Sequence, residues 1–349
     1  MANDERRYYM DILRIMAIYV VIFAHSVGFT LYTDLNPDRF TYWIYMFCSQ
    51  PAAGAVPMFL MISGALLLKK NEPYTYILRH RVLRMVVVLL LFSFVWFFYL
   101  LWKGEKRELI DLFLSIYTDP WCIPYWYLYL YIGYLLILPV LRAVAQNIDK
   151  KTMRILLFWG FCMIVVLPVT ETFGFPHLND HIRPTLLAGI TFFYPLLGYY
   201  LDQMLILEDI TKRKWIAIWI ANLLIFALSM FLTYKSGIYG GQKGDMISYV
   251  APLNNIALYL TMKKCMKASN IPDKCKKIIM TFGESVFGIY LVHSIVDGRI
   301  RQHIDIVGIL QALHVNQMIA VLVYCFIVFM VSAILVLLLK KSTFFSRIL

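Results

Sequence analysis

Long apolar stretches dominate this sequence and alternate with short charged clusters. Most of the stretches have about the twenty residues that a helix needs to cross the hydrocarbon core of a bilayer. They are continuous rather than alternating between polar and apolar positions, which favours helices over the strands of a barrel. We therefore expect an all-α polytopic bundle of about ten transmembrane helices, at 9–31, 41–68, 85–102, 121–141, 155–170, 185–201, 215–234, 247–262, 278–296 and 316–339.

Two segments between the spans have amphipathic character. Ile110, Phe113, Leu114 and Tyr117 repeat at the spacing of one helical face, and residues 297–315 show a less regular version. Both segments are expected to be helices that lie in the membrane interface. The alternative is a lid that grips a substrate.

The composition agrees with a membrane protein, since 61% of the residues are hydrophobic and 15% are charged, against about 25% charged in soluble domains. The net charge of +12 raises the question of nucleic-acid binding. However, 23 of the 33 lysines and arginines fall in alternate segments starting with the N-terminus, 9 fall in the intervening ones, and Arg14 lies within the first span. This asymmetry predicts both ends in the cytoplasm and no nucleic-acid partner. We expect one domain over residues 1–349, in the cytoplasmic membrane, with no appended soluble domain.

The first span carries three ionisable residues, which are expensive inside a bilayer and therefore suggest a functional site. At about 100° per residue, Arg14 and His25 lie within about 20° of one helical face, and Asp11 lies beside them. Their separation along the axis is about 16 Å. We expect this polar stripe to face the bundle interior. The alternative is an Asp11–Arg14 pair that anchors the helix at the interface.

Small and basic residues mark the next two spans. Ser63 and Gly64 suit a close helix contact. Arg79, Arg81 and Arg84 lie at the predicted inner mouth of the third span. Arg81 and Arg84 share a helical face, and guanidinium groups bind phosphate with a matched fork. These arginines would suit a phosphorylated cytoplasmic ligand, and anchoring on the cytoplasmic side is the alternative.

The ninth span adds another polar set. Tyr290 and His293 share a helical face, whereas Glu284 points nearly opposite to His293. A tyrosine–histidine hydrogen bond is the alternative to a catalytic role. His177 and His181 have the spacing of a metal pair, but prolines bracket them, and we expect no metal site.

Together these stretches resemble the acyltransferase family 3 membrane proteins, which O-acylate cell-surface polysaccharides and related envelope molecules. The resemblance covers nearly the whole chain in the expected order. Its residues are Asp11, Arg14 and His25, then Phe59, Ser63 and Gly64, then Arg81 and Arg84, then Trp126, Tyr127 and Leu128, and finally Gly283, Ser285, Tyr290, Leu291 and His293.

The resemblance implies transfer of an acyl group from cytoplasmic acyl-CoA, acetyl-CoA in the first instance, to a hydroxyl of an extracytoplasmic envelope glycan or related acceptor. Acyl-CoA is then a co-substrate, and no bound cofactor is expected. His25 is expected to act as general base or to carry a transient acyl group. The remaining residues fall into a catalytic set, an acyl-CoA-binding set and an acceptor-side set: Asp11, Tyr290 and His293; Arg14, Arg81, Arg84 and Ser63; and Trp126, Tyr127 and Ser285.

A transporter or exporter of a polysaccharide precursor or small metabolite is the competing hypothesis, because polar residues at membrane depth fit a translocation path as well. Acyl transfer by the purified protein distinguishes the two functions. The acceptor, the acyl length and the oligomeric state stay open, and a homo-oligomer is one of the alternatives.

Overall fold

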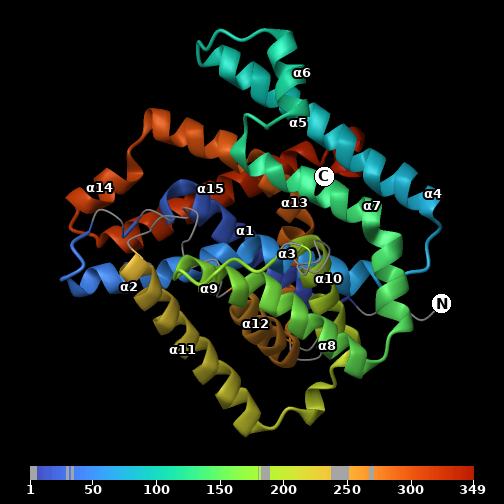
Figure 1. Ribbon diagram of the computed structural model, residues 1–349. Coiled ribbons are helices and arrows are strands. Elements are labelled where there is room, and N and C mark those ends of the chain that lie inside the picture. Colours follow the sequence, from blue (N-terminus) through green and yellow to red (C-terminus); the bar gives the residue numbers. More distant parts are fainter. Residues whose placement is uncertain are drawn as a thin grey trace. The chain divides into compact units, whose positions relative to one another are not determined.

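The computed structural model describes residues 6–28, 31–32, 35–179, 181, 189–236, 251–266 and 271–349. Every regular element in these ranges is a helix (Figure 1). Eight of the described helical segments are long and apolar enough to span a membrane: Tyr8–Ser26, Phe40–Leu67, Tyr74–Trp102, Ile123–Asn147, Lys150–Thr172, Lys212–Lys235, Asp273–His303 and Gln317–Leu339. The predicted all-α membrane bundle is confirmed, and the chain is a multi-pass membrane protein.

The two other predicted spans are present in part. Within 185–201 the structure contains α10 (Ile190–Tyr199), and α12 (Ala251–Cys265) begins within 247–262 and continues three residues beyond it. The first residues of both spans lie outside the described residues, as do residues 29–30 of the first span and Arg183, Lys243 and Lys267 of the charge count. The number of ten spans and the cytoplasmic location of both ends therefore stay predictions.

The contacts divide the chain into two compact units. Unit 1 comprises Met1–Lys70 and Leu141–Glu284, and unit 2 comprises Asn71–Val140 and Ser285–Leu349. Two long helices, α7 (Trp126–Asn147) and α13 (Asp273–His303), contribute residues to both. The prediction of a single domain over residues 1–349 is not tested by this division.

Unit 1 is built around two helices that touch through glycine. Gly64 of α3 (Ala55–Leu67) faces Pro195 of α10, and a Cβ atom at Gly64 would lie 2.0 Å from the Pro195 carbonyl oxygen. A Cβ atom at Gly198 would lie 1.9 Å from the Met61 carbonyl oxygen. Small residues allow helix backbones to approach this closely in a membrane. The packing role expected for Gly64 is confirmed.

The other helices of unit 1 surround this pair. α1 (Tyr8–Phe23) packs against α3 and α12 with a buried face that includes Leu13, Ala17 and Ile18. The remaining elements are the π-helical turn η1 (Ala24–Gly28), α2 (Phe40–Ser49), the 3-10 turn η2 (Gln50–Gly54), α8 (Lys150–Phe161), the π-helical turn η5 (Cys162–Val166), α9 (Leu167–Thr172), the π-helical turn η6 (Tyr200–Met204), the 3-10 turn η7 (Leu207–Asp209) and α11 (Lys212–Ser236).

Unit 2 contains the second half of α13 and its own set of helices. Gly288 of α13 allows close approach of α15 (Gln317–Leu339), since a Cβ there would lie 2.6 Å from Val336 Cγ1. The other elements are α4 (Tyr74–Tyr76), the π-helical turn η3 (Ile77–Val82), α5 (Leu83–Trp102), α6 (Leu109–Tyr117), the 3-10 turn η4 (Ile123–Tyr125), α14 (Ile306–Ala312) and α16 (Thr343–Ile348).

The helix expected from the amphipathic repeat near residue 110 is present as α6 (Figure 1). Glu108 and Asp111 form a capping box at its start, so the first backbone N–H groups are satisfied. The four residues of the repeat are all exposed: Ile110, Phe113, Leu114 and Tyr117. An exposed apolar face on a short helix agrees with the predicted interfacial position.

Candidate active site

Asp11 is the centre of a charged cluster at the start of α1. Its side chain is buried, although it carries a carboxylate. Arg14 Nη1 lies 3.0 Å from Asp11 Oδ1, and Arg6 Nε lies 2.9 Å from Oδ2. Each carboxylate oxygen therefore accepts a charge-assisted hydrogen bond, which offsets the loss of hydration. The Asp11–Arg14 pair, which was the alternative interpretation of the first span, is present, and it fixes the direction of the Arg14 side chain.

The Asp11 side chain also packs against α13, at Gly283. A Cβ atom at Gly283 would lie 2.8 Å from Asp11 Cβ and 2.9 Å from Asp11 Cγ. Arg6 also binds Glu284, the residue that follows Gly283, with its Nη1 atom 2.7 Å from Glu284 Oε1. Gly283 thus leaves the space that the Asp11 side chain occupies, which gives a packing reason for glycine at this position.

His25 follows α1 on the π-helical turn η1. The side chain is exposed, so the imidazole is accessible rather than enclosed in the core. The regular α-helix ends at Phe23, and a π turn has a wider repeat. The predicted angle of about 20° between Arg14 and His25 assumes an unbroken α-helix, so it does not apply to His25, which lies on the π turn. Single π turns occur often at functional sites.

A second polar network holds the start of α1 against η6. The carboxylate of Asp202, whose side chain is buried, accepts hydrogen bonds from Arg7 Nη1 and from the Tyr9 hydroxyl. Lys263 Nζ donates to the carbonyl oxygens of Leu201 at 2.8 Å and Asp202 at 2.9 Å. Burial lowers the pKa of Lys263, while the nearby Asp202 charge opposes this shift. These contacts fix the end of α1 that carries Asp11 and Arg14.

In unit 2 the two predicted phosphate-binding arginines already have protein partners. Arg81 on η3 binds Glu72 with both sides of its fork, at 3.1 Å from Nε and 2.6 Å from Nη2. Arg84 Nη2 donates to the Ile348 carbonyl oxygen at 3.0 Å. A phosphate at Arg81 would therefore share the guanidinium with Glu72 or displace it.

The Trp-Tyr-Leu segment and the last motif meet in unit 2. The Tyr290 hydroxyl donates to the Pro124 carbonyl, and the Tyr125 hydroxyl donates to the Leu291 carbonyl at 2.8 Å. The Tyr127 and Tyr290 rings lie 5.7 Å apart, edge to face. Helix α13 is thus joined to η4 by two hydrogen bonds, and to the start of α7 by the ring contact of Tyr127, one of the predicted acceptor-side residues.

His293 is buried in the same region. Its Nδ1 lies 2.7 Å from the Tyr290 carbonyl oxygen, and its Nε2 lies 3.3 Å from the Ser294 hydroxyl. A ring nitrogen this close to a carbonyl oxygen carries the proton and donates it, so Nδ1 is assigned as the N–H. Ser285 is also buried, whereas Trp126 is exposed and Ser63 in unit 1 is partly buried.

A family model described as an acyltransferase domain, the acyltransferase family 3, matches residues 7–337. The chain belongs to this family. The match extends over both compact units and includes every predicted site residue. No curated protein and no solved structure matches the chain. The protein is a membrane acyltransferase.

The structure also shows polar groups of this acyltransferase that the sequence analysis did not single out. Gln50, at the start of η2, is fully buried and accepts a hydrogen bond from the Ser229 hydroxyl at 3.3 Å. Asn255 Nδ2 donates to the Gly54 carbonyl oxygen at 2.8 Å. These groups stabilise the break in the second span, because η2 packs against both α1 and α12. A polar side chain within an apolar stretch was the sequence feature that could have identified Gln50 and Asn255.

Proposed function

We propose that this membrane acyltransferase transfers an acyl group, acetyl in the first instance, from cytoplasmic acyl-CoA to a hydroxyl of an extracytoplasmic envelope glycan. The observation that carries the proposal is the arrangement on α1 and η1. A buried carboxylate fixes Arg14, and an accessible imidazole follows on the next turns of the same segment.

In the proposed reaction the His25 imidazole accepts the proton of the acceptor hydroxyl. The hydroxyl oxygen then attacks the thioester carbonyl carbon, the new ester bond forms, and the carbon–sulfur bond breaks. The electron pair leaves with sulfur as the CoA thiolate, which takes up a proton. The balanced products are the acylated acceptor and CoA. A route through an acyl-histidine has the same balance over two steps.

The other predicted residues have supporting roles in this proposal. Arg14 holds a position fixed by Asp11, from which it supplies positive charge to the anionic donor. Arg81 and Arg84 bind CoA phosphates, with the Glu72 carboxylate keeping the Arg81 fork extended until a phosphate arrives. Ser63 belongs to the same donor-binding set.

On the acceptor side, the proposal rests on the hydrogen-bonded region of unit 2. Tyr290 and His293 are held by backbone carbonyl oxygens, so their positions are defined before substrate binds. Tyr127 lies against the Tyr290 ring, and Trp126 presents an exposed indole. Aromatic faces of this kind suit a sugar acceptor, and Ser285 completes the set.

The test is acyl transfer from radiolabelled acetyl-CoA by the protein purified in nanodiscs, with an envelope extract as acceptor. His25→Ala and His25→Gln should each reduce product formation about 100-fold or more, the usual contribution of general acid–base catalysis. His303→Ala changes another exposed histidine and should retain activity. Full activity in both His25 variants would remove the catalytic assignment. A transporter would leave acetyl-CoA unconsumed in every sample.

A further inference from the structure

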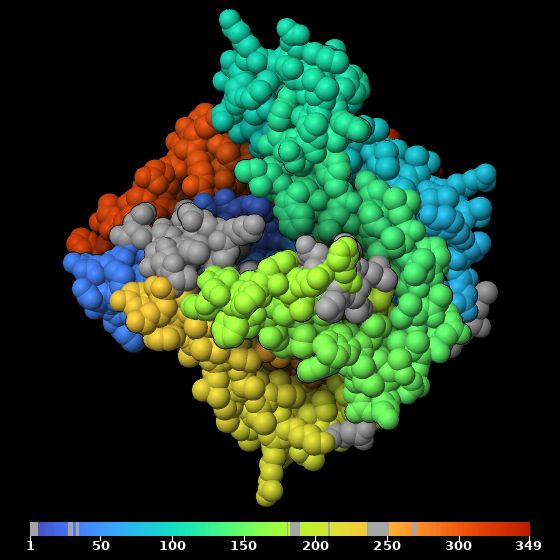
Figure 2. Space-filling model, viewed as in Figure 1, coloured from blue at the N-terminus to red at the C-terminus, as the bar shows by residue number. Residues whose placement is uncertain are grey.

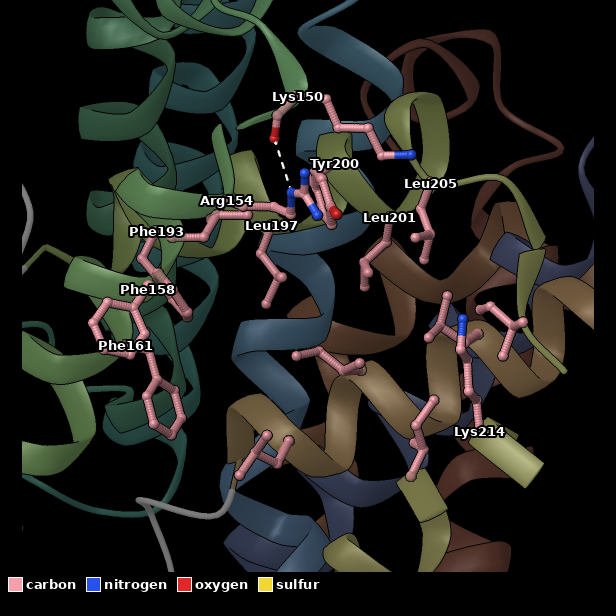
Figure 3. Close-up of a pocket in the computed structure, with 16 residues that line it drawn as sticks. Lys150, Arg154, Phe158, Phe161, Phe193, Leu197, Tyr200, Leu201, Leu205 and Lys214 are labelled. Carbon is pink, nitrogen blue, oxygen red and sulfur yellow. Dashed lines mark hydrogen bonds between the residues drawn. The ribbon is translucent and has the colours of Figure 1, made fainter. Parts of the chain in front are cut away.

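A cavity of about 600 Å³ lies within unit 1, outside the residues assigned to acyl transfer. Its walls come from α8, α10 with η6, α11 and α12. Figure 3 shows Lys150, Arg154 and Tyr200 at one end of the cavity, with Lys214 approaching from α11. Phe158, Phe161 and Phe193 group away from that end (Figure 3).

The lining has a charged end and an apolar body. Along α8 it changes from Lys150 and Arg154 to Phe158 and Phe161, over about 16 Å of helix. Along α11 it changes from Lys214 to Ile218, one turn further. Three of the described lining residues are basic and none of them is acidic. The cavity therefore combines a site for negative charge with a site for hydrocarbon.

The helices beside the cavity have large apolar side chains exposed on their surfaces. The spans that contain α8 and α11 are the least buried of the eight described spans, since only 22% and 28% of the residues in their most apolar stretches are buried. Phe158 and Trp159 on α8 are 60% and 51% exposed, and Leu224 on α11 is 65% exposed. Figure 2 shows both helices on the surface of the molecule. On transmembrane helices, exposed apolar side chains of this kind are expected to contact lipid.

We propose that this cavity binds an anionic glycerophospholipid as a structural ligand. The headgroup phosphate binds Lys150, Arg154 and Lys214, and one acyl chain lies along Phe158, Phe161 and the apolar wall. Arg154 Nε donates to the Lys150 carbonyl oxygen at 3.4 Å, which holds the guanidinium at the charged end (Figure 3). Basic pockets between transmembrane helices on the cytoplasmic side recognise acidic headgroups in this way.

The charge and the shape favour a phospholipid over acyl-CoA as the occupant. A single headgroup needs a few cations, and Lys150, Arg154 and Lys214 are the basic residues among the described lining of this cavity. The apolar wall would hold a lipid chain, which resides in the hydrocarbon region already. The proposal is independent of the acyl-transfer mechanism, because no residue of the His25, Arg81 or Tyr290 groups lines the cavity.

Native mass spectrometry of the full-length protein tests the proposal, with dioleoylphosphatidylglycerol and dioleoylphosphatidylcholine added in equal amounts. We expect one phosphatidylglycerol to be retained with at least about tenfold preference. The triple variant Lys150→Gln, Arg154→Gln, Lys214→Gln should lose that preference. The matched control Lys151→Gln, Lys212→Gln, Arg213→Gln removes the same charge from neighbouring exposed positions that do not line the cavity, and it should keep the preference.

Three results would overturn the proposal. If both triple variants lost the preference for phosphatidylglycerol equally, the lipid would be attracted by the net charge of the protein rather than bound at a site. Equal retention of the two lipids would show no recognition of the acidic headgroup. Displacement of phosphatidylglycerol by an equimolar amount of palmitoyl-CoA, in wild type but not in the cavity variant, would assign the cavity to the acyl donor instead.

Discussion

The close approach of α3 and α10 allows the effect of one substitution to be worked from distances. A Cβ atom at Gly64 would lie 2.0 Å from the Pro195 carbonyl oxygen, whereas real Cβ contacts essentially never fall below 3.0 Å. The opposing atoms are backbone, so no rotamer change relieves the overlap. The helices must separate by at least 1.0 Å, the difference between these distances. Such a gap removes about a quarter to a half of the dispersion energy of the affected contacts.

The expected destabilisation of Gly64→Ala follows from two opposing effects. Overpacking reduces stability by about 1–3 kcal/mol. Because the opposing Pro195 atoms belong to the backbone and cannot move aside, we expect a loss near the upper end of this range, about 3 kcal/mol, from overpacking at this site. Alanine is favoured over glycine within a helix by about 1 kcal/mol. The net loss is therefore about 2 kcal/mol, which corresponds to a fall in Tm of about 3 °C for a chain of 349 residues.

Thermal unfolding in detergent, followed by tryptophan fluorescence, measures this effect. Gly133→Ala in α7 is the matched control, because a Cβ there has no neighbour within 4 Å. That variant gains helix propensity without overlap and should unfold at the wild-type temperature or slightly above. If Gly64→Ala behaves like Gly133→Ala, the inferred contact between α3 and α10 is wrong.

Two further predictions concern the proposed site. Asp11→Asn should lower kcat/KM about tenfold, because losing a charge-assisted hydrogen bond costs about 1.5–3 kcal/mol and frees Arg14 to move. Steady-state kinetics with acetyl-CoA measure this, and unchanged kcat/KM in a folded variant would contradict it. Arg81→Lys should raise the KM for acetyl-CoA about tenfold with little change in kcat, since lysine lacks the bidentate fork. The same change at exposed Arg79 should have a smaller effect, and equal effects would argue for a general charge contribution.

The sequence predicts most of the helices but not their interruptions. Hydrophobic runs locate the spans, and the repeat around Ile110 locates α6. The expected span 41–68 is divided by the 3-10 turn η2, which follows from the buried contacts of Gln50 and Asn255 with distant groups. The expected span 121–141 continues to Asn147, because Arg142 and Gln146 bind the carbonyl oxygens of Leu67 and Leu68.

The candidate site shows the same division between local and distant contacts. The Asp11–Arg14 pair is three residues apart on one helix, so its geometry follows from the sequence alone. The contact of Asp11 with Gly283 joins residues from opposite ends of the chain, and periodicity contains no information about it. The same holds for Asp202, whose partners Arg7 and Tyr9 lie nearly two hundred residues earlier.

The π-helical turns explain why helical periodicity does not give the directions in which the predicted site residues point. The described residues contain four such turns, and three hold predicted site residues or the centre of the second polar network: His25 on η1, Arg81 on η3 and Asp202 on η6. Each turn widens the helical repeat and rotates every later residue away from the face that an α-helix predicts. Because a π turn is rare and has no apolar periodicity of its own, it persists where contacts elsewhere stabilise it. Glu72 at Arg81 and Arg7 at Asp202 are such contacts, so the departures from ideal helix geometry occur where charged side chains require them.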